Sequence, residues 1–92
     1  MTNLRGMSDE VPGVALLREE LSRRGIRPAE AARQLGVSKP TMGEWLAGGL
    51  RPSFLRRPEI RSWSEGRIPE DSWLTAEERA RLALVPPTPA AE

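Results

Sequence analysis

Cysteine and histidine are both absent from this chain of 92 residues. Without cysteine, neither a disulfide nor a thiolate-ligated zinc site can form. Without histidine, the chain lacks the commonest general base and the commonest metal ligand. The remaining side chains show no nucleophile beside a base in a catalytic pattern. The sequence therefore predicts a binding protein that is not an enzyme and that needs no metal or other cofactor.

Long apolar runs are also missing. No segment approaches the roughly 20 apolar residues that a membrane-spanning helix needs, and residues 1–10 contain no apolar core of a signal peptide. We therefore expect a cytoplasmic protein with no membrane partner. The length allows one domain with a modest core and is too short for two.

Charge is distributed unevenly, although the formal net charge is only +1. Residues 1–20 carry two basic and four acidic side chains, and residues 68–92 carry two basic and five acidic side chains. Residues 21–67, between them, carry ten basic and four acidic side chains, which is a net charge of +6. A basic centre of this kind favours an anionic partner such as nucleic acid.

Apolar periodicity predicts a first helix over residues 13–25. Val14, Leu17 and Leu21 recur there at the three- and four-residue spacing of a helix face, with charged residues between them. No segment shows the alternation of a strand, so an all-α protein is expected.

Capping residues and prolines indicate four further helices. Ser38 is a suitable N-cap, Thr75 and Glu78 have the spacing of a capping box, and Pro28 and Pro58 suit a first helical position. The four helices are expected over residues 28–36, 39–47, 58–64 and 76–85. The organisation that follows is a flexible lead over residues 1–12, a domain over 13–85 and a disordered, proline-rich tail over 86–92.

The most informative segment is residues 28–49, P-A-E-A-A-R-Q-L-G-V-S-K-P-T-M-G-E-W-L-A-G-G. Ala32 supplies the small residue that two steeply crossing helices need where they touch, and Gly36 supplies a turn that tolerates a positive φ. The apolar residues expected to fill the wedge between these helices are Ala31, Leu35, Val37, Met42 and Trp45. The opposite side of the second helix is polar, as a helix inserted into a DNA groove requires.

This segment resembles the helix-turn-helix of phage-repressor-like (Cro-type) transcription regulators. The resemblance covers roughly residues 13–73 and includes the L-G-V-S turn, the W-L-A-G-G end of the recognition helix and the R-P that follows. The later I-R-S-W-S-E-G-R-I-P-E-D-S-W is similar to the closing helix and loop of small phage-encoded members. The resemblance implies an all-α, five-helix, lambda-repressor-like DNA-binding domain.

Carried over by position, the resemblance implies that five residues face base edges in the major groove: Ser38, Lys39, Pro40, Thr41 and Glu44. It also implies phosphate contacts from Arg27, from the amide groups of Gly48 and Gly49, and from Arg51. Arg56 and Arg57 follow the recognition helix most closely, and we expect them to contact phosphate as well. Chemically, Lys39 can donate to guanine, Glu44 can accept from a cytosine amino group, and Thr41 can do either.

Two residues of the expected recognition helix are unusual. Gly43 lies inside it and costs roughly 1 kcal/mol relative to alanine. It either lets the backbone approach the bases closely or is simply tolerated. Pro40 disfavours a helical conformation for Lys39, but a proline in the first turn removes no hydrogen bond within the helix.

Aromatic and acidic residues outside this segment have simpler interpretations. Trp45, Trp63 and Trp73 could serve as stacking platforms for single-stranded nucleic acid. Core packing is favoured because Trp45 lies on the core side of its helix, and because Trp63 and Trp73 flank the G-R-I-P turn and can clamp it onto the core. Glu70 and Asp71 are adjacent acids, which are more typical of a helix start than of a catalytic pair.

The predicted function is sequence-specific binding of double-stranded DNA by a transcriptional repressor. A domain this small contacts few base pairs, so we expect a homodimer on a palindromic operator with half-sites about 34 Å apart. The residues expected to form the dimer interface are Leu74, Leu82, Leu84 and Val85. The alternative is a protein-interaction module, an antitoxin or phage accessory factor, that uses the same fold to bind a partner protein.

Overall fold

The computed structural model describes residues 10–84 of the chain. Within this range the protein contains five α-helices, one short 3₁₀ helix and no strand, which confirms the expected all-α class. The helices are α2 (Pro12–Arg24), α3 (Pro28–Leu35), α4 (Lys39–Ala47), α5 (Arg56–Trp63) and α6 (Ala76–Leu84), and the 3₁₀ helix is η1 (Glu70–Trp73). None of the described helices is long and apolar enough to cross a membrane.

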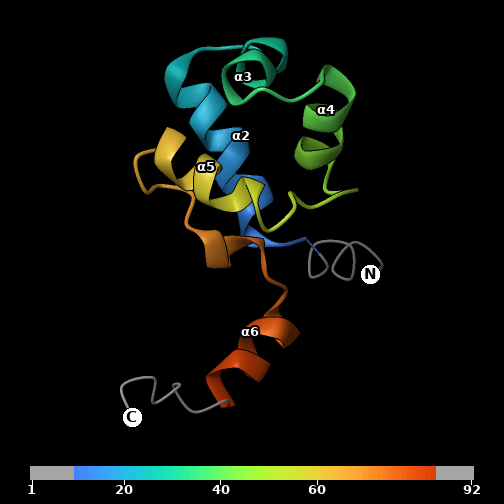
Figure 1. Ribbon diagram of the computed structural model, residues 1–92, viewed down its shortest axis with the longest axis vertical. Helices are drawn as coiled ribbons and strands as arrows, with labels where there is room; N and C mark the ends of the chain where they lie inside the picture. Colours follow the sequence, from blue (N-terminus) through green and yellow to red (C-terminus); the bar gives the residue numbers. More distant parts are fainter. Residues whose placement is uncertain (1–9, 85–92) are drawn as a thin grey trace, which may run out of the picture.

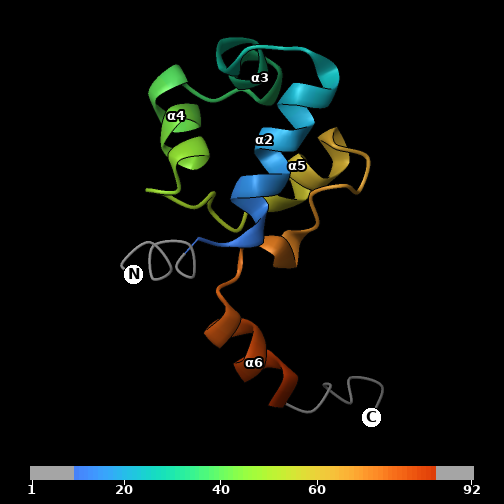
Figure 2. The ribbon, with the colours of Figure 1, turned by 180° about the vertical axis from the view of Figure 1, so that it is seen from behind.

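Helix α2 lies at the centre of a compact group formed by α2, α3, α4 and α5 (Figure 1). Helix α4 contacts both α2 and α3, while α5 contacts α3 and η1, and η1 in turn contacts α2. Helix α6 lies beyond η1, apart from the other four helices, in both Figure 1 and Figure 2. The arrangement therefore consists of one packed body and one helix that extends from it.

The core is formed by apolar residues from every element of the body. Trp73 is fully buried and Trp45 is 2% exposed, so the expected core positions of these tryptophans are confirmed. Trp63 is partly buried, packs against the core and donates from Nε1 to Gln34 Oε1 at 2.8 Å. The buried apolar residues are Val11, Val14, Leu17, Leu21, Ala31, Ala32, Leu35, Met42, Trp45, Ile60, Ile68 and Trp73.

Local signals position most helix ends where the sequence predicts them. Gly36 has a φ of 72° and ends α3, as the expected turn requires. The predicted capping box is present: the Thr75 amide donates to Glu78 Oε1 at 2.9 Å, and the Glu78 amide donates to Thr75 Oγ1 at 3.0 Å. These signals act within four residues along the chain, which is why they can be recognised in the sequence.

Two boundaries differ from the prediction. Helix α2 begins at Pro12 and Val11 is buried in the core, so the domain includes residues that were expected in a flexible lead over 1–12. Helix α5 begins at Arg56 rather than at Pro58, because Ser53 O accepts hydrogen bonds from the amides of residues 56 and 57. Proline then falls within the first turn, where its missing N–H costs nothing. The remainder of the expected lead (residues 1–9) and the expected tail (residues 86–92) lie outside the described residues.

The sequence did not predict η1, which carries Trp73 into the core. A Cβ added at Gly13 would lie 2.5 Å from Trp73 Cδ2, so the indole ring packs directly on the backbone of α2. Only glycine allows this approach. Burial of the ring leaves its Nε1 without a hydrogen-bond partner among the described residues.

Replacing Gly13 by alanine is expected to destabilise the protein by about 1–3 kcal/mol, because the added methyl group overpacks the core against Trp73. Gly43→Ala is the matched control: no atom of the described residues lies within 4 Å of a Cβ added there, so it should stabilise α4 by up to about 1 kcal/mol. Urea unfolding followed by tryptophan fluorescence measures both. Equal effects of the two substitutions would contradict the close packing at Gly13.

A buried carboxylate joins α2 to the segment that follows α5. Glu20 is 2% exposed and accepts from Arg67 Nε at 2.9 Å, from Arg24 Nε at 2.6 Å and from Arg23 Nη2 at 2.7 Å. The hydrogen bond from Arg67, assisted by those from the other two arginines, lowers the pKa of Glu20 from 4.5 to about 2 despite its burial. Arg24 also donates to the carbonyl of Trp63 and stacks on its ring at 4.1 Å. Helices α2 and α5 are thus held together by one carboxylate and its arginines.

We predict that Glu20→Gln lowers the free energy of unfolding by about 3 kcal/mol at pH 7, because the arginines lose the charge that they share. The folded-state pKa lies below the ordinary value, so this stabilisation is complete above about pH 4.5 and is lost as the pH falls toward 2. The difference between wild type and variant should therefore shrink in acid. Glu19→Gln, at an exposed neighbouring position, is the control and should have little effect. A pH-independent difference would contradict the interpretation.

Candidate nucleic-acid interface

The first turn of α4 is held by its N-cap. Ser38 Oγ accepts from the Thr41 amide at 3.2 Å and donates to Thr41 Oγ1 at 2.9 Å. Pro40 is the second residue of the helix and has no N–H group. The N–H groups of the first turn have no partner within a helix, so a proline at this position removes no hydrogen bond. The helix therefore starts sharply at Lys39, as predicted, and the proline does not disturb it.

Helix α4 has a buried side and an exposed side. Met42 is fully buried and Trp45 nearly so, and both belong to the core cluster that includes Ala32 and Leu35 of α3. The exposed residues recur at helical spacing and lie on the opposite side: Lys39, Pro40, Gly43, Glu44 and Ala47. This face is short, mostly uncharged and free of large apolar side chains.

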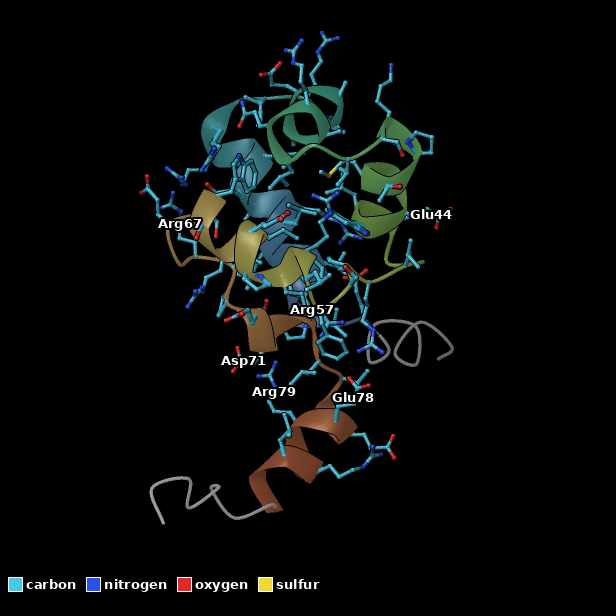
Figure 3. The ribbon with its side chains drawn as sticks, in the orientation of Figure 1. Glu44, Arg57, Arg67, Asp71, Glu78 and Arg79 are labelled. Carbon is cyan, nitrogen blue, oxygen red and sulfur yellow. The ribbon has the colours of Figure 1, made fainter. Side chains whose placement is uncertain are left out.

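The structure brings all five predicted base-contacting residues together on this face and at its N-terminal edge. Thr41 is half-buried, and the other four are exposed: Ser38, Lys39, Pro40 and Glu44. The Glu44 side chain points away from the body (Figure 3) and passes over Gly49, where an added Cβ would lie 2.6 Å from Glu44 Oε1. Neither Lys39 nor Glu44 forms an ion pair with another residue in the range 10–84.

An open groove of about 490 Å³ runs along one side of α4. Its walls are the turn at residues 36–38, Thr41, the residues that follow α4, and Arg56. Arg18 Nε donates to Leu46 O at 3.0 Å and ties the C-terminal half of α4 to α2. The exposed face of α4 is thus carried by a helix that is anchored to both of its neighbours.

Of the predicted phosphate-contacting arginines, Arg56 lines this groove, and Arg27 lies at the start of α3. Arg27 is the exposed N-cap residue of α3 and has no ion-pair partner among the described residues. Arg56 is half-buried, donates to Leu35 O at 3.2 Å and pairs with Glu59 at 2.9 Å. Arg27 is therefore fully available to a ligand, whereas Arg56 holds α5 against the end of α3 and its charge is partly compensated.

The Gly48 and Gly49 amides, which were predicted to bind phosphate, are hydrogen-bonded within the protein. Gly48 has a φ of 82°, and its N–H donates to Trp45 O at 3.2 Å. The N–H of Gly49 donates to Glu44 O at 3.0 Å. Both amides close the C-terminal end of α4 and satisfy its last carbonyl groups, so neither is a free donor.

Arg51 is also committed within the protein. Its Nη1 donates to Trp73 O at 3.0 Å and to Glu78 Oε1 at 2.7 Å, and its Nη2 donates to Glu78 Oε2 at 3.3 Å. The hydrogen bond with Arg51 lowers the pKa of Glu78 to about 2, with a further contribution from the Thr75 amide. Arg51 therefore fastens η1 and the start of α6 to the segment after α4, although it also lines the groove beside α4, and its predicted phosphate contact stays a prediction.

Arg57 is likewise engaged within the protein. It is 7% exposed, donates from Nε to Pro52 O at 2.9 Å and lies 4.3 Å from the ring centre of Phe54. Burial lowers its pKa. Adjacent residues of a helix point about 100° apart, so Arg56 and Arg57 cannot both face the groove beside α4.

Ion pairs compensate most of the positive charge of residues 21–67. Within residues 21–67, seven of the ten cations pair with acids: Arg23, Arg24, Arg33, Arg51, Arg56, Arg61 and Arg67. Arg57 is buried, which leaves Arg27 and Lys39 as the exposed cations of that stretch without an acidic partner among the described residues. Arg27 lies at the start of α3, and Lys39 lies at the start of α4. A nucleic acid would therefore meet a small positive surface at these helix ends.

Comparison with protein-family models, with curated proteins and with solved structures gives no match.

Proposed function

We propose that the protein binds double-stranded DNA in a sequence-specific manner, with α3 and α4 acting as a helix-turn-helix and α4 lying in the major groove. The observation that carries this proposal is the exposed face of α4, which is polar, short and rigidly held from behind by Met42 and Trp45. A buried apolar side opposite a small polar side is what a groove-inserted helix needs. We further propose that the protein represses transcription.

The side chains on this face are suited to base edges. The major groove of B-DNA admits an α-helix and presents a distinct pattern of donors and acceptors for each base pair. Lys39 is a donor for guanine O6 and N7, and Glu44 is an acceptor for the amino group of cytosine. Ser38 and Thr41 hydrogen-bond to each other and can exchange that contact for one with a base.

The phosphate backbone is contacted by few residues in this arrangement. Arg27 lies at the N-terminal end of α3, where the helix dipole also favours an anion. Arg56 lines the groove beside α4. Arg27 and Arg56 of each copy therefore neutralise about one or two phosphates, which corresponds to a slope of log K against log[salt] of about −1 to −2 per copy.

The decisive experiment is selection from a pool of random duplexes at physiological salt. Recovery of one palindrome with half-sites about a helical turn apart is the expected result. Weak, salt-sensitive retention with no common sequence would reject sequence-specific binding.

Binding of the selected duplex then tests which of two arginines, Arg27 or Arg51, contacts phosphate. Arg27→Ala should lower the magnitude of the salt slope by about 0.9 per copy and leave thermal stability unchanged, because a phosphate contact is lost. Arg51→Ala should leave the slope unchanged and lower the melting temperature, because it removes contacts to Trp73 and Glu78. Fluorescence anisotropy at several salt concentrations measures the slope. If instead Arg51→Ala lowers the magnitude of the salt slope and Arg27→Ala leaves it unchanged, then Arg51 contacts phosphate and Arg27 does not.

Gly43 offers a second test of α4 as the contacting helix. None of residues 10–84 lies within 4 Å of a Cβ added at Gly43, so packing in this part of the chain does not explain the glycine. If DNA approaches the backbone there, Gly43→Ala should weaken binding of the selected duplex about tenfold while it stabilises the fold. Ala47→Ser is the control: it makes a change of similar size at the exposed C-terminal end of the same face and should leave the affinity unchanged. Unchanged affinity would mean that the bases do not approach α4 at this point.

A second candidate function is binding of a partner protein. It is favoured by the exposure of Phe54 (76%) and Leu55 (84%), and by the small number of unpaired cations around α4. An antitoxin or a phage accessory factor would use the fold in this way. Failure of the duplex selection would make this the leading proposal.

A further inference from the structure

Arg51 lies between two parts of the molecule that are otherwise separate. It lines the open groove beside α4, which it shares with Ser38, Thr41 and Arg56. Its guanidinium also reaches the start of α6, where Glu78 lies at the junction between the body and this helix (Figure 3). The side chain of Arg51 is 38% exposed. One partly exposed cation therefore connects the groove that we propose for DNA with the helix that extends from the body.

The contact between Arg51 and Glu78 has the geometry of an arginine–phosphate contact. Nη1 of Arg51 donates to Oε1 of Glu78 at 2.7 Å, and Nη2 donates to Oε2 at 3.3 Å. Two such N–H···O bonds to one anion are also the arrangement in which arginine binds a phosphate group. Glu78 thus occupies the terminal edge of the guanidinium and compensates its charge, as a phosphate of DNA would do.

The carboxylate of Glu78 also acts on a second arginine. Burial lowers the pKa of Arg57, the nearby charge of Arg51 lowers it further, and Glu78 opposes both effects. Glu78 itself is ionised at neutral pH, because the hydrogen bond from Arg51 lowers its pKa to about 2. This one carboxylate therefore offsets the positive charge of two neighbouring guanidinium groups.

Helix α6 is attached to the body at its first turn. Besides the pair of Arg51 and Glu78, Arg79 Nη2 donates to Asp71 O at 2.9 Å. None of the buried apolar residues in the range 10–84 belongs to α6, and Leu82 on this helix is 58% exposed. The side chain of Leu84 and all of Val85, which were expected at a dimer interface, lie outside the described residues. Glu78 can therefore leave Arg51 without any change in the core.

We propose that Glu78 competes with DNA for Arg51 and so makes an autoinhibitory contact within the chain. While the carboxylate holds the guanidinium, the groove beside α4 attracts phosphate less strongly. Loss of the carboxylate, or its displacement, releases Arg51 to the backbone of the duplex. The inference rests on the proposed function, because it concerns phosphate contacts at the same groove. It adds that α6, which contacts no base in this arrangement, sets the affinity for DNA.

Glu78→Gln tests the competition, because glutamine removes the charge and can still form the capping box with Thr75. The magnitude of the slope of log K against log[salt] should rise by about 0.9 per copy, and the affinity at about 0.1 M salt should rise at least about threefold. Fluorescence anisotropy measures both, with the selected duplex and with a mixed-sequence duplex of the same length.

Glu77→Gln is the matched control. It removes the same charge from the neighbouring residue of α6, which is 82% exposed and pairs with Arg81 instead of Arg51. The control should leave the salt slope unchanged, because no guanidinium at the groove is released. Circular dichroism and thermal unfolding establish that both variants are folded, which is expected because α6 contributes no residue to the buried apolar core of the described chain.

A double-mutant cycle identifies the cation that is released. In a chain that carries Arg51→Ala, Glu78→Gln should change the salt slope no more than Glu77→Gln does, because the guanidinium for which carboxylate and phosphate compete is absent. An equal gain with and without Arg51 would mean that Glu78 acts only through its general negative charge, and this would overturn the proposal.

The outcomes separate the competition from sequence-specific binding. If the wild type selects one palindrome but Glu78→Gln leaves slope and affinity unchanged, the competition is overturned and the proposed function stands. The competition is also overturned if Arg51→Ala alone lowers the slope of the wild type, because Arg51 then contacts phosphate while Glu78 is present. If selection fails but Glu78→Gln strengthens binding of the mixed-sequence duplex through Arg51, the competition is supported and sequence specificity is rejected. If neither chain binds any duplex, both proposals are rejected.

Discussion

The indole ring of Trp73 packs directly onto the backbone of Gly13, and this contact joins the two ends of the described body. The ring is fully buried, and the carbonyl of the same residue accepts a hydrogen bond from Arg51, which follows α4. One residue of a short 3₁₀ helix therefore connects the start of α2, the segment after α4 and the approach to α6. The contact depends on glycine at position 13, because any larger residue would meet the ring.

Arginine side chains act mainly as structural connectors in this protein. Glu20 collects Arg23, Arg24 and Arg67 on a single buried carboxylate, and Glu78 holds Arg51 at the opposite end of the body. A buried carboxylate is stable only when its charge is compensated and its oxygen atoms are hydrogen-bonded. The high arginine content of the chain therefore supports the fold before it supports a ligand, and composition alone overstates the positive surface offered to DNA.

Helices α4 and α6 differ in how they are held, and this difference is physically useful. The face of α4 is polar and small and belongs to a helix fixed from behind by the core, which suits the reading of a fixed pattern of base edges. Helix α6 contributes no residue to the buried apolar core of the described chain, and polar contacts of Arg51 and Arg79 join its start to the body. A change at α6 can therefore alter the charge beside the groove without altering the core that holds α4.

The amino-acid sequence by itself determined the all-α class, most helix ends, the N-cap at Ser38, the capping box at Thr75 and the buried and exposed sides of α4. These features depend on interactions within about four residues along the chain, which spacing reveals directly. The tertiary structure alone decided the partners of Arg51 and Arg67 and the place of η1. Arg67 lies 47 residues from Glu20 and Arg51 lies 27 residues from Glu78 along the chain, so no local pattern marks these pairs. The internal contacts of Arg51 and Arg57 were not predicted for this reason: the charge of a side chain can be read from the sequence, but the groups that it contacts are set only when the helices pack.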